Sequence, residues 1–172
     1  MTIPGRPGRG EAAPYYSRYI DLVSSDDVVG VLETQLRETT ALLGGISEDR
    51  SRYRYAPDKW SLREMLSHVS DTERVFAARA FWFARGIDSP LPDFDQDPCA
   101  RAARADEIPW ARHVDEFRAV REGTLALLKN LFPEAWSRTG VASGNTFTVR
   151  AVAYIAAGHV AHHLAVLKDK YS

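Results

Sequence analysis

Hydrophobic side chains recur every three or four positions in four long segments of the chain, with polar residues between them. This period places the apolar residues on one face of a helix, so the pattern predicts four amphipathic helices. They cover residues 26–44, 61–85, 109–131 and 148 almost to the C-terminus. The apolar stripe of the last helix is Val152, Ala156, His159, Val160, His163 and Leu167.

Local signals indicate where these helices begin and end. Asp26 or Asp27 can cap the first helix, and the Gly44-Gly45 pair stops it. The second helix begins with Ser61 and Glu64 in the spacing of a capping box, in which each side chain accepts a hydrogen bond from a free backbone N–H group. This is the clearest helix start in the sequence.

The connection over residues 86–109 is much longer than a simple turn. It contains four prolines and scattered acidic residues, so we expect it to be irregular. Four amphipathic helices without convincing strands predict an all-α fold. The expected architecture is a four-helix bundle with a long crossover connection between helices 2 and 3.

The N-terminal segment differs in composition from the rest. Residues 1–14 are rich in glycine and proline and predict a flexible tail, or an extended arm over the domain. The aromatic cluster of Tyr15, Tyr16 and Tyr19 that follows should dock on the domain. Residues 15–172 then form a single domain, because 172 residues suffice for one real core but not for two.

The charge balance excludes several classes of partner. The 22 basic and 23 acidic residues give a net charge of −1, which argues against nucleic acid and against a membrane surface. No apolar stretch is long enough to span a bilayer, and the first residues lack the apolar run of a signal peptide. The single cysteine, Cys99, cannot form an internal disulfide. We therefore expect a cytoplasmic protein.

Two histidines of the last helix point the same way. His159 and His163 are four residues apart, so they project from consecutive turns, and both fall in the apolar stripe. Buried imidazoles need hydrogen-bond partners or something to coordinate. A metal ion satisfies both rings, whereas the alternative is a pair of core histidines tied to backbone or carboxylate groups.

His68 supplies a third nitrogen from another helix. It lies at one edge of the apolar stripe of the second helix and can meet His159 and His163 across the bundle. Three histidines leave coordination positions open, which suits a catalytic site better than a closed structural one. His162 projects about 100° round the helix from His163, so it falls either at the bundle edge or behind the ligands. His113 has no partner at ligand spacing, so we interpret it as structural or solvent-facing.

Two carboxylates are candidates for acid/base catalysis. Asp71 follows His68 by one turn and can orient its imidazole. Glu73 interrupts the apolar stripe, and a buried carboxylate must be paired or have a raised pKa. The alternative for Glu73 is an ion pair with an arginine, such as Arg74, Arg79 or Arg85. Val160 follows His159 where a zinc peptidase has its glutamate base, so the peptidase interpretation fails.

The acidic segment 92–97 permits two interpretations. It is either a lid whose carboxylates reach the metal or a solvated loop with helix-capping aspartates. Cys99 has no activating base nearby in the sequence, which makes it a weak candidate for a nucleophile.

Three motifs together resemble those of one family, the DinB/YfiT-like superfamily of metalloenzymes (the damage-inducible helical family, unrelated to the polymerase of the same name). Residues 59–64, Lys-Trp-Ser-Leu-Arg-Glu followed by His68, resemble the entry to the ligand-bearing helix. Residues 71–74, Asp-Thr-Glu-Arg, resemble the continuation in one branch, and residues 158–163, Gly-His-Val-Ala-His-His, resemble the closing signature. The resemblance extends from about Tyr15 to Tyr171.

The resemblance implies a four-helix bundle, commonly dimeric, with three histidines around nickel, zinc or a similar ion. By position these ligands are His68, His159 and His163. Characterised relatives include transferases and isomerases that use bacillithiol, mycothiol or glutathione. Family membership therefore implies a site without naming a substrate.

These observations predict a metal-dependent enzyme with a three-histidine divalent metal site, either a hydrolase or a small-thiol-dependent transferase. The expected cofactor is nickel or zinc. The expected partners are a small-molecule substrate, with a low-molecular-weight thiol as a candidate, and a second copy of the chain. The alternatives are a metal-containing protein that binds a small ligand without turnover, and a dimeric bundle with structural histidines.

Overall fold

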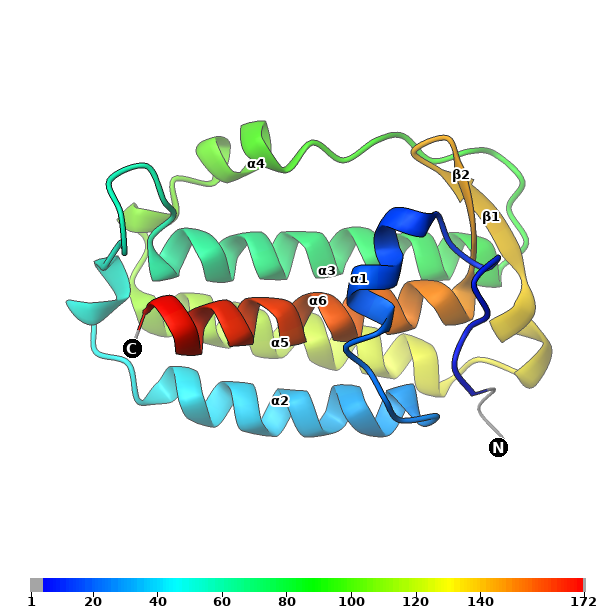
Figure 1. The fold of residues 1–172 in the computed structure, drawn as a ribbon, viewed down its shortest axis with the longest axis horizontal. Coiled ribbons are helices and arrows are strands. Elements are labelled where there is room, and N and C mark those ends of the chain that lie inside the picture. Colours follow the sequence, from blue (N-terminus) through cyan, green and yellow to red (C-terminus); the bar gives the residue numbers. More distant parts are fainter. Residues whose placement is uncertain (1–4, 172) are drawn as a thin grey trace.

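The computed structural model describes residues 5–171 and confirms the all-α four-helix bundle (Figure 1). The four long helices are α2 (Val28–Gly44), α3 (Leu62–Ala84), α5 (Trp110–Lys129) and α6 (Val149–Lys170). The smaller elements are α1 (Ser17–Ile20), α4 (Gln96–Ala103), β1 (Thr139–Ala142) and β2 (Asn145–Thr148). Single 3₁₀ turns lie at Pro14–Tyr16, Arg50–Arg52, Ala105–Glu107 and Pro133–Ser137.

Side-chain caps begin three of the long helices. Asp27 accepts a hydrogen bond from the backbone of Gly30 at the start of α2. Ser61 and Glu64 form the capping box of α3 with both of its hydrogen bonds. Thr148 caps α6 in the same way as Asp27 caps α2. Each cap satisfies a backbone N–H group that the first turn would otherwise leave without a partner.

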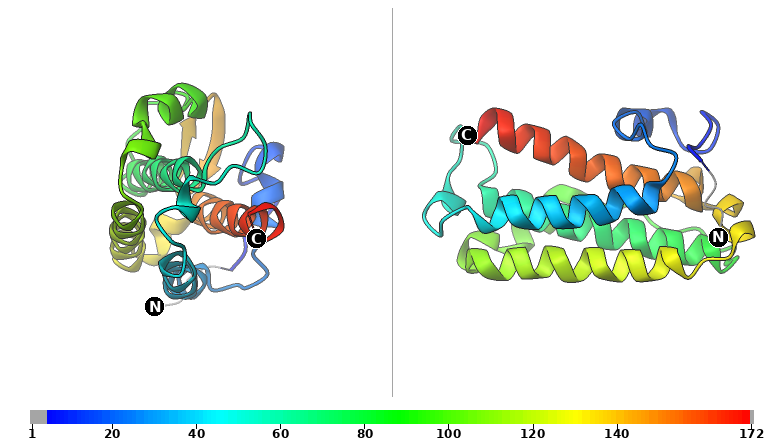
Figure 2. Two further views of the ribbon diagram at one scale, coloured as in Figure 1. Left: turned by 90° about the vertical axis from the view of Figure 1, so that its left-hand side faces the viewer. Right: turned by 90° about the horizontal axis from the view of Figure 1, so that it is seen from below.

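The crossover connection determines the topology. Helices α3 and α5 run in the same direction and lie side by side, since the chain between them returns along the whole length of the bundle (Figure 2). This segment is less irregular than expected, because it contains α4. Asp95 caps α4, and Pro98 stands in its first turn, where a missing N–H group costs nothing.

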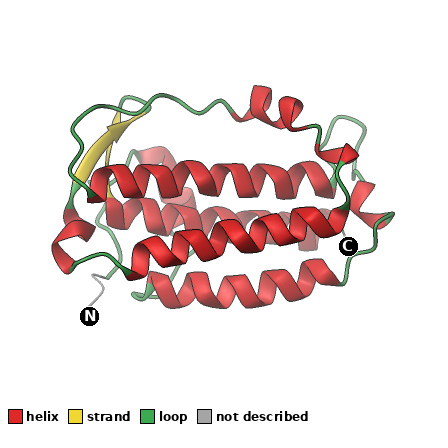
Figure 3. Ribbon diagram, turned by 180° about the vertical axis from the view of Figure 1, so that it is seen from behind, coloured by secondary structure: helices red, strands yellow, loops and turns green. Residues whose placement is uncertain are grey.

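A hairpin closes one end of the bundle (Figure 3). Strands β1 and β2 pair antiparallel, from Thr139 opposite Thr148 to Ala142 opposite Asn145. Both turn residues, Ser143 and Gly144, have positive φ, as a two-residue hairpin turn requires. The sequence pattern predicted only a loop here, because strands of four residues are too short to display an alternating pattern.

Helix α6 is the central element of the fold. Residues 151–160 are all buried, since α1, α2 and α3 pack around this part of α6. The histidine His159 therefore lies in the interior and not on a solvated face. No helix within residues 5–171 combines the length and apolar character of a transmembrane span.

The N-terminal segment contacts the bundle through Glu11. The backbone N–H and the hydroxyl of Thr148 both donate to Glu11, and the guanidinium of Arg150 forms an ion pair with it. Of the tail predicted over residues 1–14, residues 1–4 lie outside the described residues. The flexibility of this segment stays a prediction.

Candidate metal centre

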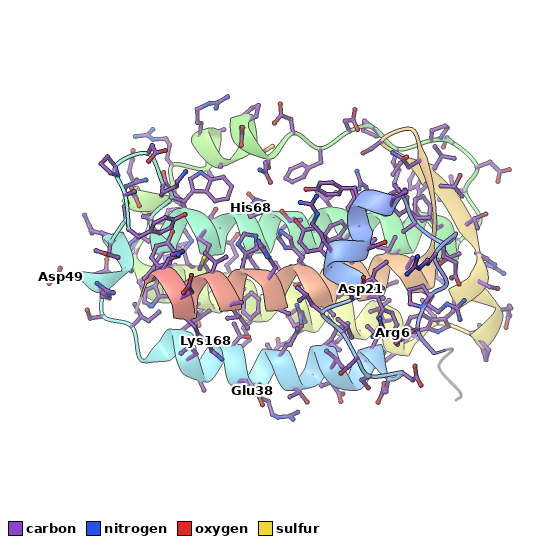
Figure 4. All side chains as sticks on the ribbon, viewed as in Figure 1. Arg6, Asp21, Glu38, Asp49, His68 and Lys168 are labelled. Carbon is purple, nitrogen blue, oxygen red and sulfur yellow. The ribbon has the colours of Figure 1, made fainter. Side chains whose placement is uncertain are left out.

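Helices α3 and α6 bring three histidines together in the middle of the bundle. His68 stands two turns after the capping box of α3 and lies beneath α4 in the view of Figure 4. His159 and His163 stand on successive turns of α6, on the side that packs against α3. The three predicted ligands are thus adjacent in space.

The side-chain nitrogens of these residues converge. Nε2 of His159 lies 3.2 Å from Nε2 of His68 and 3.1 Å from Nε2 of His163. The three ligand atoms all lie within 4.8 Å of one another. His68 and His159 are only 5% and 4% exposed, and His163 is half-buried.

This geometry fits a metal ion. Two ligands bound tetrahedrally at the usual zinc–nitrogen distance lie about 3.3 Å apart, close to the two separations measured from Nε2 of His159. Burial lowers the pKa of His68 to about 4, of His159 to about 2 and of His163 to about 3. The rings are therefore neutral at physiological pH, the form in which imidazole binds zinc, nickel, copper or iron.

The neighbours of His68 hold its ring in place. The Oγ1 atom of Thr72 lies 3.3 Å from Nδ1 of His68, on the side away from the other two histidines. The ring of Trp60 lies 4.8 Å from the His68 ring, centroid to centroid. The contact expected from Asp71 is thus made by Thr72, while Asp71 accepts a hydrogen bond from Arg74 at 3.0 Å. Burial raises the pKa of Asp71.

Glu73 belongs to a buried ion pair. Nε and Nη2 of Arg121, on α5, donate to its two carboxylate oxygens at 2.7 and 2.8 Å. Glu73 is 2% exposed and Arg121 is not exposed at all. Arg121 also donates to Gln35 and to the carbonyl oxygen of Leu32, so the pair links three helices. The alternative of an ion pair is therefore what the structure shows, but none of the three arginines expected from the sequence is the partner.

A cavity of about 470 Å³ opens above two of the histidines. His68 and His159 lie at one end, and the far end is formed by Arg79 and Ser143. The aromatic cluster at the N-terminus and the acidic segment before α4 supply the walls, so both features noted in the sequence belong to this site. The remaining lining residues are Tyr15, Tyr16, Tyr19, Thr72, Val75, Phe76, Asp93, Phe94, Asp95, Gln96 and Asp97.

A second cavity, of about 330 Å³, reaches His163 from another side. Its walls include Trp60, Tyr171 and Asp97, and Asp97 also lines the larger cavity. The three histidines thus stand between two cavities. Neither Asp71 nor Glu73 lines either of them.

The remaining candidate residues lie outside the cluster. His162 is exposed and its ring contacts those of Tyr19 and His163. His113 is buried, and its Nε2 lies 2.9 Å from the carbonyl oxygen of Ala105, which makes it structural and excludes the solvent-facing alternative. Cys99 is half-buried on α4 and lines neither cavity.

Comparison with known proteins identifies the same fold elsewhere. The family model of the DinB superfamily matches residues 32–167. YfiT from Bacillus subtilis, described as a probable metal-dependent hydrolase with an unusual four-helix bundle topology, matches with a TM-score of 0.69 and 13% identity, over 96% of this chain and 91% of that chain. A mycothiol-dependent maleylpyruvate isomerase matches with a TM-score of 0.67 and 11% identity, over 80% of this chain and 58% of that chain. No curated protein matches the sequence. At such identities the structural likeness shows the fold alone.

Proposed function

The chain belongs to the DinB superfamily, and on that basis we propose that it is a metal-dependent enzyme acting on a small molecule. The observation that carries the proposal is the convergence of three neutral imidazoles, two of which line the end of a cavity. A divalent ion held there, nickel or zinc by preference, supplies a Lewis acid that lowers the pKa of water or of a thiol and polarises a carbonyl oxygen.

The chain itself positions and desolvates the reactants. Thr72 and Trp60 hold the His68 ring, so the ligand set is oriented before any substrate enters. Tyr19 covers His159 with its ring, and burial raises the pKa of Tyr19 to about 12. Its phenol therefore stays protonated at physiological pH at the cavity wall.

Proton transfer at this site needs an acid or a base near the histidines. Asp71 and Glu73 are the candidates from the sequence. Glu73 is bound by Arg121 through both oxygens, so a role in proton transfer requires this ion pair to open. Asp71 is half-buried and follows His68 by one helical turn, and it must give up its hydrogen bond with Arg74 to face the site.

Two reaction classes remain, hydrolysis and transfer of a small thiol. The two cavities that flank the histidines favour thiol transfer, because a reaction of water needs room for only one organic reactant. One structural relative is described as a hydrolase and the other as mycothiol-dependent. We propose a low-molecular-weight thiol as one reactant and a small electrophile as the other.

Metal analysis and an activity screen test this proposal. Protein purified without a histidine tag should contain about one nickel or zinc ion per chain. Small thiols offered with electrophiles, and ester and amide substrates offered alone, should distinguish transfer from hydrolysis. His163→Ala should lose both metal and activity, whereas His162→Ala, which changes an exposed neighbour at the wall of the second cavity, should keep the metal.

Each alternative function has its own outcome in this experiment. Stoichiometric metal without turnover would favour a non-catalytic protein that binds a small ligand. Absence of metal would favour a structural bundle.

A homodimer is proposed independently of these outcomes, and sedimentation at micromolar concentration tests it: a monomer alone would contradict it. A cytoplasmic location stays a prediction.

A further inference from the structure

Arg79 is a buried cation at the end of the larger cavity away from the histidines. The side chain projects from α3 and is only 5% exposed. Its Nη2 donates to Oγ of Ser143 at 2.9 Å and lies 3.5 Å from the carbonyl oxygen of Pro92. Nε and Nη1 donate no hydrogen bond to any residue within 5–171, so they are the groups that a molecule in the cavity would meet.

The other buried arginines have carboxylate partners. Arg121 is held by Glu73, and Arg63 forms an ion pair with Glu48. For Arg79, no carboxylate oxygen of the described residues lies within 4.0 Å of the guanidinium. A charge removed from water without a counter-charge is unfavourable, and arginine does not lose its proton to relieve this cost. A ligand with a negative charge would relieve it.

The aspartates of the cavity do not fill this role. Asp93, Asp95 and Asp97 line the same cavity, but all three are exposed. Asp95 accepts a hydrogen bond from the backbone N–H of Asp97 as the cap of α4. Because water and salt screen exposed charges, these carboxylates act weakly on a ligand beside the buried guanidinium.

Arg79 and His68 lie on the same face of α3. They are eleven residues apart, which amounts to three helical turns and a rise of about 16 Å. Thr72, Val75 and Phe76 lie between them on this face and also line the cavity. Long side chains on a helix lean toward its N-terminus, which is the direction of His68. A ligand that touches both ends must therefore be elongated.

We propose that Arg79 binds an oxyanion group of the substrate, a carboxylate or a phosphate. This inference rests on the proposed function, which places the reacting group of the substrate at the histidines. The guanidinium presents Nε and Nη1 to the oxyanion while Nη2 stays bound to Ser143. The substrate class is thus an elongated small molecule with an anionic group remote from its reacting atom.

Binding of matched small probes tests this subsite. Butanoate, butyl phosphate and butanamide have similar apolar parts but differ in the charge and geometry of the head group. Calorimetric titration should give binding of butanoate or butyl phosphate to the metal-loaded protein at least about tenfold tighter than binding of butanamide, as a charge-assisted hydrogen bond allows. The tighter of the two identifies the oxyanion.

Four variants test whether Arg79 causes the preference for the anionic probes over butanamide. Arg79→Gln should abolish it, and Arg79→Lys should retain part of it, because the charge remains and the fork geometry is lost. Arg85→Gln removes an exposed arginine at the end of the same helix and should leave the preference intact. Ser143→Gly removes the hydroxyl that holds Nη2 of Arg79, at a residue whose φ is 52°, which suits glycine, and should weaken the preference because the guanidinium is no longer oriented.

Several results would overturn the inference. One is equal affinity of the wild-type protein for the three probes, a result that does not depend on any variant. Another is an anion preference that survives in Arg79→Gln. A preference that vanishes on removal of the metal would assign the anion to the metal instead. Turnover without an anion preference counts against this inference alone, and an anion preference without turnover counts against the proposed function alone.

Discussion

Gly158 allows α1 to lie so close to α6 that a Cβ atom at this position would stand 2.0 Å from the carbonyl oxygen of Tyr19. The contact is with backbone, so it cannot be relieved by rotation of a side chain. It lies directly before His159, the most deeply buried of the three histidines, and the Tyr19 ring rests 5.5 Å from the His159 ring. The position of the cavity wall therefore depends on the absence of a side chain at residue 158.

Gly158→Ala should displace α1 and lower the free energy of unfolding by about 1–3 kcal/mol, the usual cost of overpacking. Gly123→Ala is the matched control, because Gly123 lies on α5 with no atom near its would-be Cβ. There the alanine should stabilise the protein slightly through its higher helix propensity. Urea unfolding measures both. Equal stability of Gly158→Ala and wild type would show that α1 does not need this contact.

The buried pair of Glu73 and Arg121 gives a second prediction. Glu73→Gln removes one charge and leaves Arg121 buried without its partner, which should cost about 3–5 kcal/mol of stability. The double variant Glu73→Met, Arg121→Met should recover much of this loss, because no unpaired charge remains. Urea unfolding of the single and double variants provides the measurement.

The same variants decide whether Glu73 takes part in catalysis. If it is only structural, the double variant should retain kcat once it is folded. Loss of kcat in the folded double variant, together with a changed pH profile, would instead support the predicted acid/base role.

The metal-free protein should become less stable on acidification. Burial lowers the pKa of His68 to about 4, whereas an unfolded histidine titrates near 6.5. Between these values the unfolded chain binds a proton that the folded chain does not, so stability is unaffected above about pH 6.5 and falls as the pH decreases. The slope is about 1.4 kcal/mol per pH unit for each such histidine.

Urea unfolding of the metal-free protein between pH 7 and pH 5 checks this slope. His68→Gln should show a shallower slope, because one of the buried imidazoles is gone. A stability that does not change over this range would mean that the histidines are more accessible to water and protons than the structure indicates.

Local features of the fold were predictable, and features made by distant segments were not. The capping box at Ser61 and the pair His159 and His163 depend on residues within one or two turns, so the sequence displays them directly. The partner of Glu73 is 48 residues away on another helix, and nothing in the spacing distinguishes Arg121 from nearer arginines. The ion pair was foreseeable as a type, but its partner was not.

The cavity could not be predicted from the sequence for the same reason, because distant segments form it. Its walls come from the N-terminal tyrosines, α3, the acidic segment and the hairpin turn, and their juxtaposition requires the crossover topology. The short helix α4 and the hairpin have too few residues for a periodic pattern. The sequence indicates Arg79 only as a candidate partner for Glu73, because its position in a cavity wall is a property of the assembled fold.

The last prediction concerns what orients His68. Thr72 Oγ1 lies 3.3 Å from Nδ1 of His68, whereas Asp71 is bound to Arg74. Loss of a hydrogen-bonding partner behind a metal ligand costs about 10- to 100-fold in metal affinity. Thr72→Val, which conserves shape and removes the hydroxyl, should therefore weaken metal binding by about tenfold, and Asp71→Asn should change it little. Competition with a chromophoric chelator measures both affinities. A larger effect of Asp71→Asn would mean that Asp71 turns from Arg74 to the imidazole when the metal binds, as the sequence alone had suggested.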